Sequence, residues 1–147
     1  MYQRILIATD GSALSKKAIR HGIGLAKAAG AELVALTVVP RYPISYFEGA
    51  ITISADQIAR TEAGWAEKAQ EVVDGACDAA NAEGLKCKAV VARSDLVAES
   101  ILSAARKNKC DLIVMASHGR KGLKRVLLGS ETQQVLTHSQ IPVLVLR

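Results

Sequence analysis

Two glycine-containing turns near the end of the chain have the residue types and spacing of a phosphate-binding site. Gly119 follows an apolar segment, and after nine intervening residues Gly129 and Ser130 open a predicted helix. The backbone N–H groups at a helix start carry partial positive charge and suit an anion, and a glycine lets a ligand approach the backbone closely. Four cationic side chains lie between the two turns: Arg120, Lys121, Lys124 and Arg125. The chemistry that this pattern predicts is binding of a phosphate group.

The same residues also fit an ordinary helix start, and on spacing alone both interpretations stay open. Ser130 and Gln133 have the spacing of a capping box, in which their side chains satisfy N–H groups of the helix start. Glu131 falls in the first helical turn, where its carboxylate complements the helix dipole and competes with a bound anion. A phosphate at this position therefore requires that Glu131 point away or meet a divalent cation.

Motifs of other nucleotide-binding and catalytic sites are missing from the sequence. There is no GxxxxGK[ST] phosphate loop and no GxSxG nucleophile turn, and the GIG segment at 22–24 lies inside a predicted helix rather than after a strand. His21, His118 and His138 lack the spacing of metal ligands. We therefore predict no catalytic residue and no metal held by protein side chains.

The elements that must position these residues alternate between strands and helices. Apolar, β-branched segments predict strands at Gln3–Thr9, Glu32–Val39, Leu85–Arg93, Asp111–Ser117 and Ile141–Leu146. Apolar residues at helical spacing predict helices that begin after Ser12 and that cover Ala55–Ala82, Leu96–Lys107 and Glu131–His138. This order predicts an α/β fold, with one open, parallel, five-stranded, Rossmann-like sheet and helices on both faces. In such sheets ligands bind beyond the carboxyl ends of the strands, which here are the segments at 9–10, 38–40 and from Ser117 onward.

The ends of the helices carry capping signals. Ser12 is predicted to cap the first helix, and Gly30 to take the left-handed conformation just beyond it. Ser94 or Asp95 is available as the cap of the helix at 96–107.

Length and composition are those of one globular domain. The 147 residues are 50% hydrophobic and 22% charged, which excludes an intrinsically disordered chain, and we predict a single domain over residues 1–147. The net charge of +5 favours anionic partners only weakly. No stretch is apolar enough for a signal peptide or a membrane span. Cys77, Cys87 and Cys110 lack CxxC spacing and are predicted to be reduced, mostly buried thiols of a cytoplasmic protein.

The least regular segment is the one at 40–54. It carries two of the three prolines and three aromatic residues, Tyr42, Tyr46 and Phe47. A loop of this length is typical either of a ligand-covering or partner-binding role or of aromatic side chains packed over the adjacent helix, and both interpretations stay open.

Over essentially its whole length the chain resembles the universal stress proteins, in particular their ATP-binding subgroup. The resemblance is carried by the opening RILIATDGS, the strand LVALTVV, the segment DLIVMASHG and the ending LLGSETQQVLTHSQIPVLVLR. The nucleotide motif of that family is a glycine, two residues, a second glycine, nine residues, and then Gly-Ser or Gly-Thr. Gly119, Gly129 and Ser130 match it, whereas Ala116 stands where the family has its first glycine. The added methyl group costs little if the backbone φ angle of Ala116 is negative.

The resemblance implies an adenine nucleotide site and assigns residues to it. Ala8, Thr9 and Asp10 are implied to meet the adenine and ribose, together with the backbone of Val38 and the side chain of Met115. The triphosphate is implied to be held by Gly119, Gly129, Ser130 and Thr132, whereas His118 is implied to reach the ribose or a phosphate and Ala116 to lie near both.

The resemblance also implies a cofactor, partners and a role. ATP is expected with Mg²⁺ or Mn²⁺ held through phosphate oxygens, and a homodimer is expected to form through the last strand, at Pro142–Leu146. The implied function is a cytoplasmic regulatory module of the stress response with an unidentified protein partner and slow or no ATP turnover. One alternative is a family member with a degenerate site that acts as a dimeric interaction module. The other is an enzyme or nucleic-acid binder that uses the basic loop. Stacking of bases would need aromatic residues among the cations of this loop, whereas the aromatic residues of the chain cluster elsewhere. We accordingly predict binding neither to nucleic acid nor to a membrane.

Overall fold

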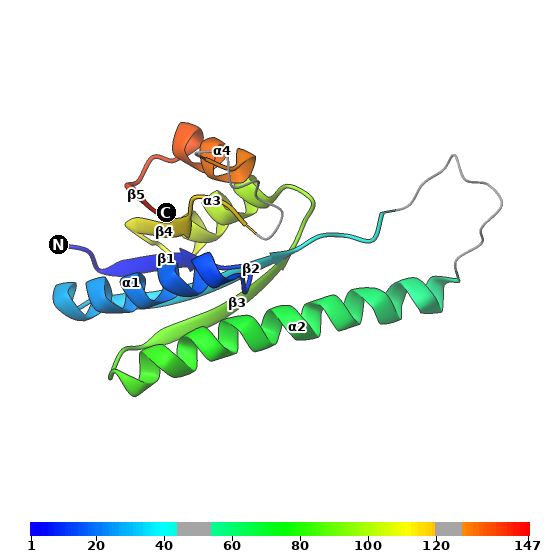
Figure 1. The fold of residues 1–147 in the computed structure, drawn as a ribbon, viewed down its shortest axis with the longest axis horizontal. Helices are drawn as coiled ribbons and strands as arrows, with labels where there is room; N and C mark the ends of the chain where they lie inside the picture. Colours follow the sequence, from blue (N-terminus) through cyan, green and yellow to red (C-terminus); the bar gives the residue numbers. More distant parts are fainter. Residues whose placement is uncertain (44–53, 120–127) are drawn as a thin grey trace.

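A computed structural model of the chain describes residues 1–43, 54–119 and 128–147. In chain order its elements are β1 (Arg4–Ala8), α1 (Ala13–Ala29), β2 (Glu32–Val39), α2 (Ala55–Ala82), β3 (Cys87–Arg93), α3 (Val97–Lys107), β4 (Leu112–Ala116), α4 (Ser130–His138) and β5 (Val143–Leu146). Figure 1 shows their arrangement. The alternating order confirms the predicted α/β fold.

The five strands form one parallel sheet in the order β3-β2-β1-β4-β5. From β1 the chain adds β2 and β3 on one side, whereas β4 and β5 lie on the other side. The direction of winding therefore reverses between β1 and β4, and ligands of doubly wound sheets bind beside such a reversal.

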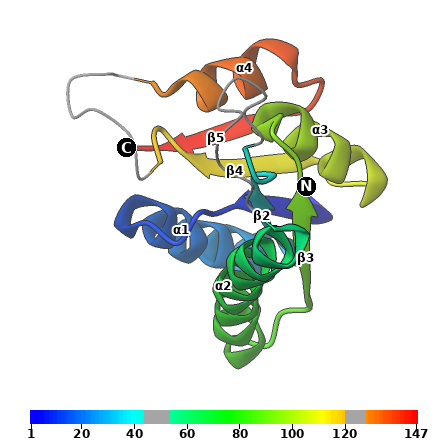
Figure 2. The ribbon, with the colours of Figure 1, turned by 90° about the vertical axis from the view of Figure 1, so that its right-hand side faces the viewer.

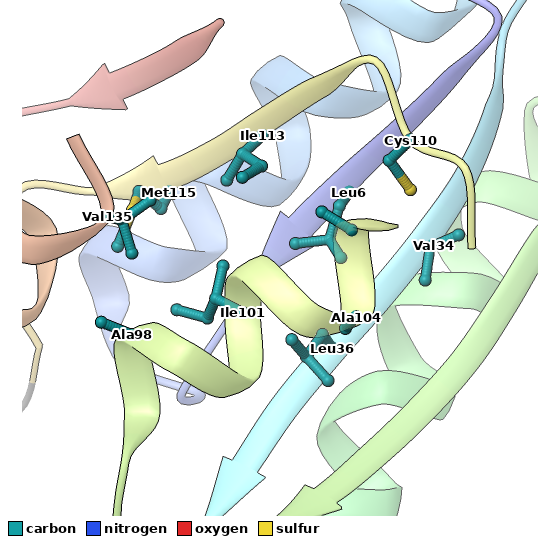
Figure 3. Packing of buried hydrophobic residues seen from close by; sticks show 11 residues of the cluster. Leu6, Val34, Leu36, Ala98, Ile101, Ala104, Cys110, Ile113, Met115 and Val135 are labelled. Carbon is teal, nitrogen blue, oxygen red and sulfur yellow. The ribbon is translucent and has the colours of Figure 1, made fainter. Parts of the chain in front are cut away.

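Successive residues of the strands face opposite layers, as strand geometry requires. Leu6, Ile113 and Met115 face α3 and α4, where they pack with Ile101 and Leu36 (Figure 3). The intervening residues face α1 and α2, which cover the other face (Figure 2). In the part of the chain that the structure describes, no helix is long and apolar enough to cross a membrane.

Helix α1 packs unusually close to β1 because a glycine lies between them. Gly22 is buried, and a Cβ atom built on it would come within 2.5 Å of the Cδ1 atom of Ile7, itself fully buried. The Ser12 side chain accepts a hydrogen bond from the N–H of Ser15 and caps the helix, and Gly30 ends it with a φ of 69°, which confirms both predictions. The start of α1 is thereby held beside the end of β1.

The prediction of a side-chain cap on α3 was wrong. Its N-cap is Leu96, with no side-chain hydrogen bond to the helix. The Ser94 hydroxyl instead accepts the N–H of Leu96 at 3.0 Å, and the Asp95 carboxylate accepts the N–H of Arg41 at 2.9 Å. Both side chains accept hydrogen bonds from residues outside the helix, and neither bonds to an N–H group in the first turn of α3.

The prediction of three reduced thiols was also wrong, because Cys77 and Cys87 form a disulfide. Cys77 lies on the buried face of α2, and the turn after α2 returns the chain so that the Cα atom of Cys87 lies 5.1 Å away. Bonding of this kind needs only proximity and not CxxC spacing. Cys110 is the free cysteine, and burial raises the pKa of its thiol to about 11. The disulfide removes the support that reduced thiols gave to the prediction of a cytoplasmic protein, which stays a prediction.

Loss of the disulfide is expected to destabilise the fold. A bond between residues 10 positions apart restricts the unfolded chain and contributes about 2–3 kcal/mol to the free energy of unfolding. We expect the double variant Cys77→Ala/Cys87→Ala to unfold at lower urea concentration than the wild type, followed by the fluorescence of the single tryptophan, Trp65. In the presence of a reductant the two proteins should unfold at nearly the same urea concentration. Equal stability without reductant would contradict the prediction.

The segment at 40–54 is described only at its ends. The Tyr42 ring stacks on Trp65 of α2, with ring centroids 6.0 Å apart. This contact agrees with aromatic packing over the adjacent helix for Tyr42, whereas Tyr46 and Phe47 lie outside the described residues.

Candidate functional site

A cavity of about 140 Å³ lies at the carboxyl ends of β1, β2 and β4, beside the reversal in strand order. Most of the predicted site residues line it, namely Ala8, Thr9, Asp10, Val38, Met115, Ala116, His118, Gly119 and Thr132. Five further residues line it that the sequence analysis did not assign: Ser15, Leu36, Val97, Ile101 and Glu131. Segments far apart in the sequence therefore converge on one hollow.

One end of the cavity is apolar. Leu36 and Met115 contribute from the sheet, and Ile101 reaches them from α3, as the close view in Figure 3 shows. All three are almost fully buried, and they belong to the core cluster between the sheet and α3. A preformed apolar surface of this kind suits a flat apolar group such as a nucleobase.

The turn between β1 and α1 is held by hydrogen bonds at the edge of this cavity. The hydroxyl of Thr37 donates to the carbonyl oxygen of Thr9 at 2.8 Å, and the N–H of Thr9 donates to the carbonyl oxygen of Leu36 at 2.9 Å. The Thr9 hydroxyl donates to that of Ser15 at 3.0 Å, and both side chains are buried. The turn is thus tied to β2 as well as to its own helix.

This turn places Asp10 at the rim of the cavity. One carboxylate oxygen of Asp10 accepts the N–H of Ser12 at 2.9 Å. A Cβ atom built on Gly119 would lie 2.6 Å from the other oxygen, so a larger residue would require the Asp10 carboxylate to shift. Gly119 therefore lets the two turns approach each other closely.

Helix α4 begins beside the cavity with a different cap from the predicted one. Its N-cap is Gly129, with φ −66° and ψ 158°, and Ser130 is already the first helical residue. No side chain of the described residues caps the helix, and the Gln133 side chain donates to the carbonyl oxygen of Leu128 at 3.0 Å instead of completing a capping box. The predicted capping role of Ser130 was wrong, because Ser130 lies one residue too far into the helix. The first N–H groups of α4 consequently lack a side-chain acceptor.

Two hydrogen bonds fix the start of α4 to the end of β4. The N–H of Gly129 donates to the carbonyl oxygen of Ser117 at 2.7 Å. The hydroxyl of Thr132 donates to the carbonyl oxygen of Ala116 at 2.9 Å, and Thr132 is almost fully buried. The Thr132 hydroxyl proton is therefore already used. Gly129 and Ser130 do not line the cavity but lie directly beside residues that do.

His118 contacts the side chain of its neighbour. The Ser117 hydroxyl is buried and lies 3.2 Å from the Nδ1 atom of His118. A neutral ring with its proton on Nε2 would accept the Ser117 hydroxyl at Nδ1 and could donate a hydrogen bond from Nε2.

Ala116 fits the site without backbone strain. Among the described residues other than glycine, Lys109 alone has a positive φ. The last residue of β4 is thus in ordinary extended conformation, and its methyl group only narrows the cavity.

The charged side chains that line the cavity among the described residues are Asp10 and Glu131. The described part of the chain holds no group of three or more histidine, cysteine or acidic residues able to bind a metal ion. The four predicted cations at 120–125 lie outside the described residues.

The unassigned lining residues are brought in by packing across elements. Val97 and Ile101 are one helical turn apart on α3, a spacing that can be read from the sequence. Nothing in the sequence indicates which strand end they approach. Leu36 lies two residues before Val38 and faces the same side of β2. This strand periodicity is the signal by which the sequence identifies Leu36 as a further lining residue. From the sequence, Glu131 is expected to compete with a bound anion unless it points away or meets a divalent cation, and the structure places it at the cavity.

Comparisons with known proteins agree with this architecture. The model of the universal stress protein family matches residues 1–147. The universal stress protein MJ0531 of Methanocaldococcus jannaschii is 34% identical over 149 residues, which covers 100% of this chain and 83% of the relative. The structure of MJ0577 from the same organism is similar with a TM-score of 0.84 at 28% identity, and covers 99% of this chain and 96% of that one. A universal stress protein solved in complex with cAMP has a TM-score of 0.71 at 26% identity, with 99% and 97% covered. The chain belongs to the universal stress protein family.

Proposed function

We propose that the cavity binds ATP together with Mg²⁺ and that the protein acts as a nucleotide-dependent regulatory module of the stress response. The observation that carries the proposal is the convergence of the predicted residues of β1, β2, β4 and α4 on one cavity. A universal stress protein of similar fold was solved with cAMP, which supports an adenine nucleotide as the class of ligand.

The donor set of the cavity fits such a ligand in two parts. The apolar end, with Leu36 and Met115, suits the adenine, and the carboxylate of Asp10 at the rim can accept hydrogen bonds from the base or the ribose. The N–H groups at the start of α4 suit phosphate oxygens. The glycines at 119 and 129 leave room at positions where a Cβ atom would press on Asp10 or on the Ser117 carbonyl oxygen.

The cation would be held mainly through phosphate oxygens and water. Mg²⁺ keeps several water ligands and needs only one or two carboxylates besides the phosphates. Bound there, it would neutralise the charge of the triphosphate. Slow or no turnover is proposed because the sequence has no Walker-type lysine motif and no GxSxG turn.

Calorimetric titration of the nucleotide-stripped protein with ATP and Mg²⁺ tests the proposal. Saturable binding of about one ATP per chain is the expected result. If folded protein binds no ATP at millimolar concentration, the alternative of a dimeric interaction module without a working nucleotide site takes its place. Oligonucleotide binding that falls with salt and is unaffected by ATP would instead favour a nucleic-acid binder.

We also propose that the protein is a homodimer that pairs through β5. This strand lies at the edge of the sheet, and Leu144 at its centre is 38% exposed. An apolar edge strand needs covering. An unidentified protein partner stays a prediction.

Charge on the β5 edge is expected to separate the dimer. Leu144→Asp should reduce the mass measured by light scattering from that of two chains to that of one, because a carboxylate would be desolvated in the interface. Leu136→Asp is the matched control, since Leu136 is similarly exposed, at 41%, but lies on α4. Wild-type protein of single-chain mass would overturn the dimer proposal.

A further inference from the structure

We infer that Glu131 makes the cavity selective for a nucleotide whose phosphates carry a divalent cation, and that it discriminates against the same nucleotide without the cation. This inference rests on the proposed function, since it concerns how the proposed site distinguishes forms of its ligand.

Glu131 lies beside the N–H groups at the start of α4, where the proposed function places the phosphates. It is the second residue of α4, it lines the cavity, and its side chain is exposed. The neighbouring residue Thr132 is bonded to the carbonyl oxygen of Ala116, so the first turn of α4 is held firmly against β4. Glu131 is therefore kept at the rim of the cavity by the position of its own helix.

The Glu131 carboxylate is available for a ligand. Among the described residues it makes no hydrogen bond and no ion pair, in contrast to the carboxylate of Asp10, which accepts the N–H of Ser12. Among the described residues no side chain caps α4, so the negative charge of Glu131 is the acidic group in the first turn that complements the helix start. A free polyphosphate arriving at these N–H groups would compete with that charge and be repelled by it.

A divalent cation reverses the sign of this interaction. Carboxylate oxygens are hard ligands of the kind that Mg²⁺ prefers, so a cation on the phosphates turns Glu131 from a repelling group into an attracting one. Glu131 lines the cavity beside the start of α4. Through this carboxylate the cavity is suited to a polyphosphate whose charge is already compensated.

The test compares Glu131→Gln with the wild type in calorimetric titrations of ATP and of adenosine, each in EDTA and in MgCl₂. In EDTA the variant should bind ATP about tenfold more tightly than the wild type, because one repelling charge is removed. In MgCl₂ the advantage should vanish or reverse. Adenosine affinity should be the same for both proteins under both conditions, since adenosine carries no phosphate.

Glu99→Gln is the matched control. Glu99 also lies in the first turn of an α-helix, α3, and is exposed, but it does not line the cavity. This variant should leave all four affinities unchanged.

The outcomes separate failure of the inference from failure of the proposed function. Equal ATP affinity of wild type and Glu131→Gln in EDTA, or a change that is the same in EDTA and MgCl₂, would overturn the inference while ATP and adenosine still bind. Absence of binding of both ligands to the wild type would overturn the proposed function, and the inference with it.

Discussion

Replacing Gly129 with valine is expected to weaken ATP binding at least about a hundredfold, through loss of hydrogen bonds from the start of α4 to charged phosphate oxygens. A Cβ atom at this position would lie 3.3 Å from the carbonyl oxygen of Ser117 and 3.5 Å from the Cα atom of His118. The two further methyl groups of valine would then occupy space beside the first N–H groups of the helix. Calorimetric titration with ATP and Mg²⁺ measures the effect.

The same substitution at Gly24 provides the control for Gly129→Val. Gly24 lies on the exposed side of α1, and a Cβ atom there would meet no other atom within 4 Å. Gly24→Val should bind ATP like the wild type, and Gly129→Val should keep a cooperative thermal unfolding transition. Wild-type ATP affinity in Gly129→Val would show that the phosphates do not lie at the start of α4.

Substitution of Asp10 is expected to weaken binding of adenosine and of ATP alike, by about tenfold to a hundredfold, because a charged hydrogen-bond acceptor is lost. In the proposed site this carboxylate lies at the base and ribose. Asp10→Ala should therefore leave the affinity for free triphosphate nearly unchanged. Competition titrations with adenosine, ATP and inorganic triphosphate measure the three effects.

Asp10→Asn separates the role in binding from the role in folding of the turn. Asparagine retains an acceptor for the N–H of Ser12, the bond of 2.9 Å that shapes the turn, but it lacks the negative charge and the second acceptor. We expect Asp10→Asn to melt like the wild type and to bind adenosine nearly as weakly as Asp10→Ala. Loss of triphosphate and adenosine binding to the same degree would place Asp10 at the phosphates instead.

The order of elements and most of the cavity could be predicted because both follow from local patterns. Alternating strands and helices with short connections leave few topologies, and the carboxyl ends of parallel strands meet at one edge. Parallel pairing of the strands predicts that the segments at 8–10, 38 and 115–119 meet at this edge, and all three line the cavity.

The remainder depended on geometry that the sequence does not encode locally. A shift of the helix start by one position decides whether Gly129 or Ser130 is the N-cap of α4, and glycine and serine are both common at that position. The pairing of Cys77 with Cys87 depends on the rotation of α2 about its axis and on the length of the following turn. Ile101 joins the cavity only because α3 packs across the end of β4. The packing of α2 and α3 determines the last two.

The methyl resonances of methionine would show directly whether an adenine nucleotide occupies this cavity. The chain has two methionines: Met115, which lines the cavity and is 6% exposed, and Met1, which is fully exposed and serves as an internal reference. Titration of protein carrying ¹³C-labelled methionine methyl groups with ATP and Mg²⁺ should shift the Met115 signal saturably, through the ring current of the adenine, and leave the Met1 signal in place. A Met115 signal that stays unmoved while calorimetry reports ATP binding would show that the nucleotide binds elsewhere.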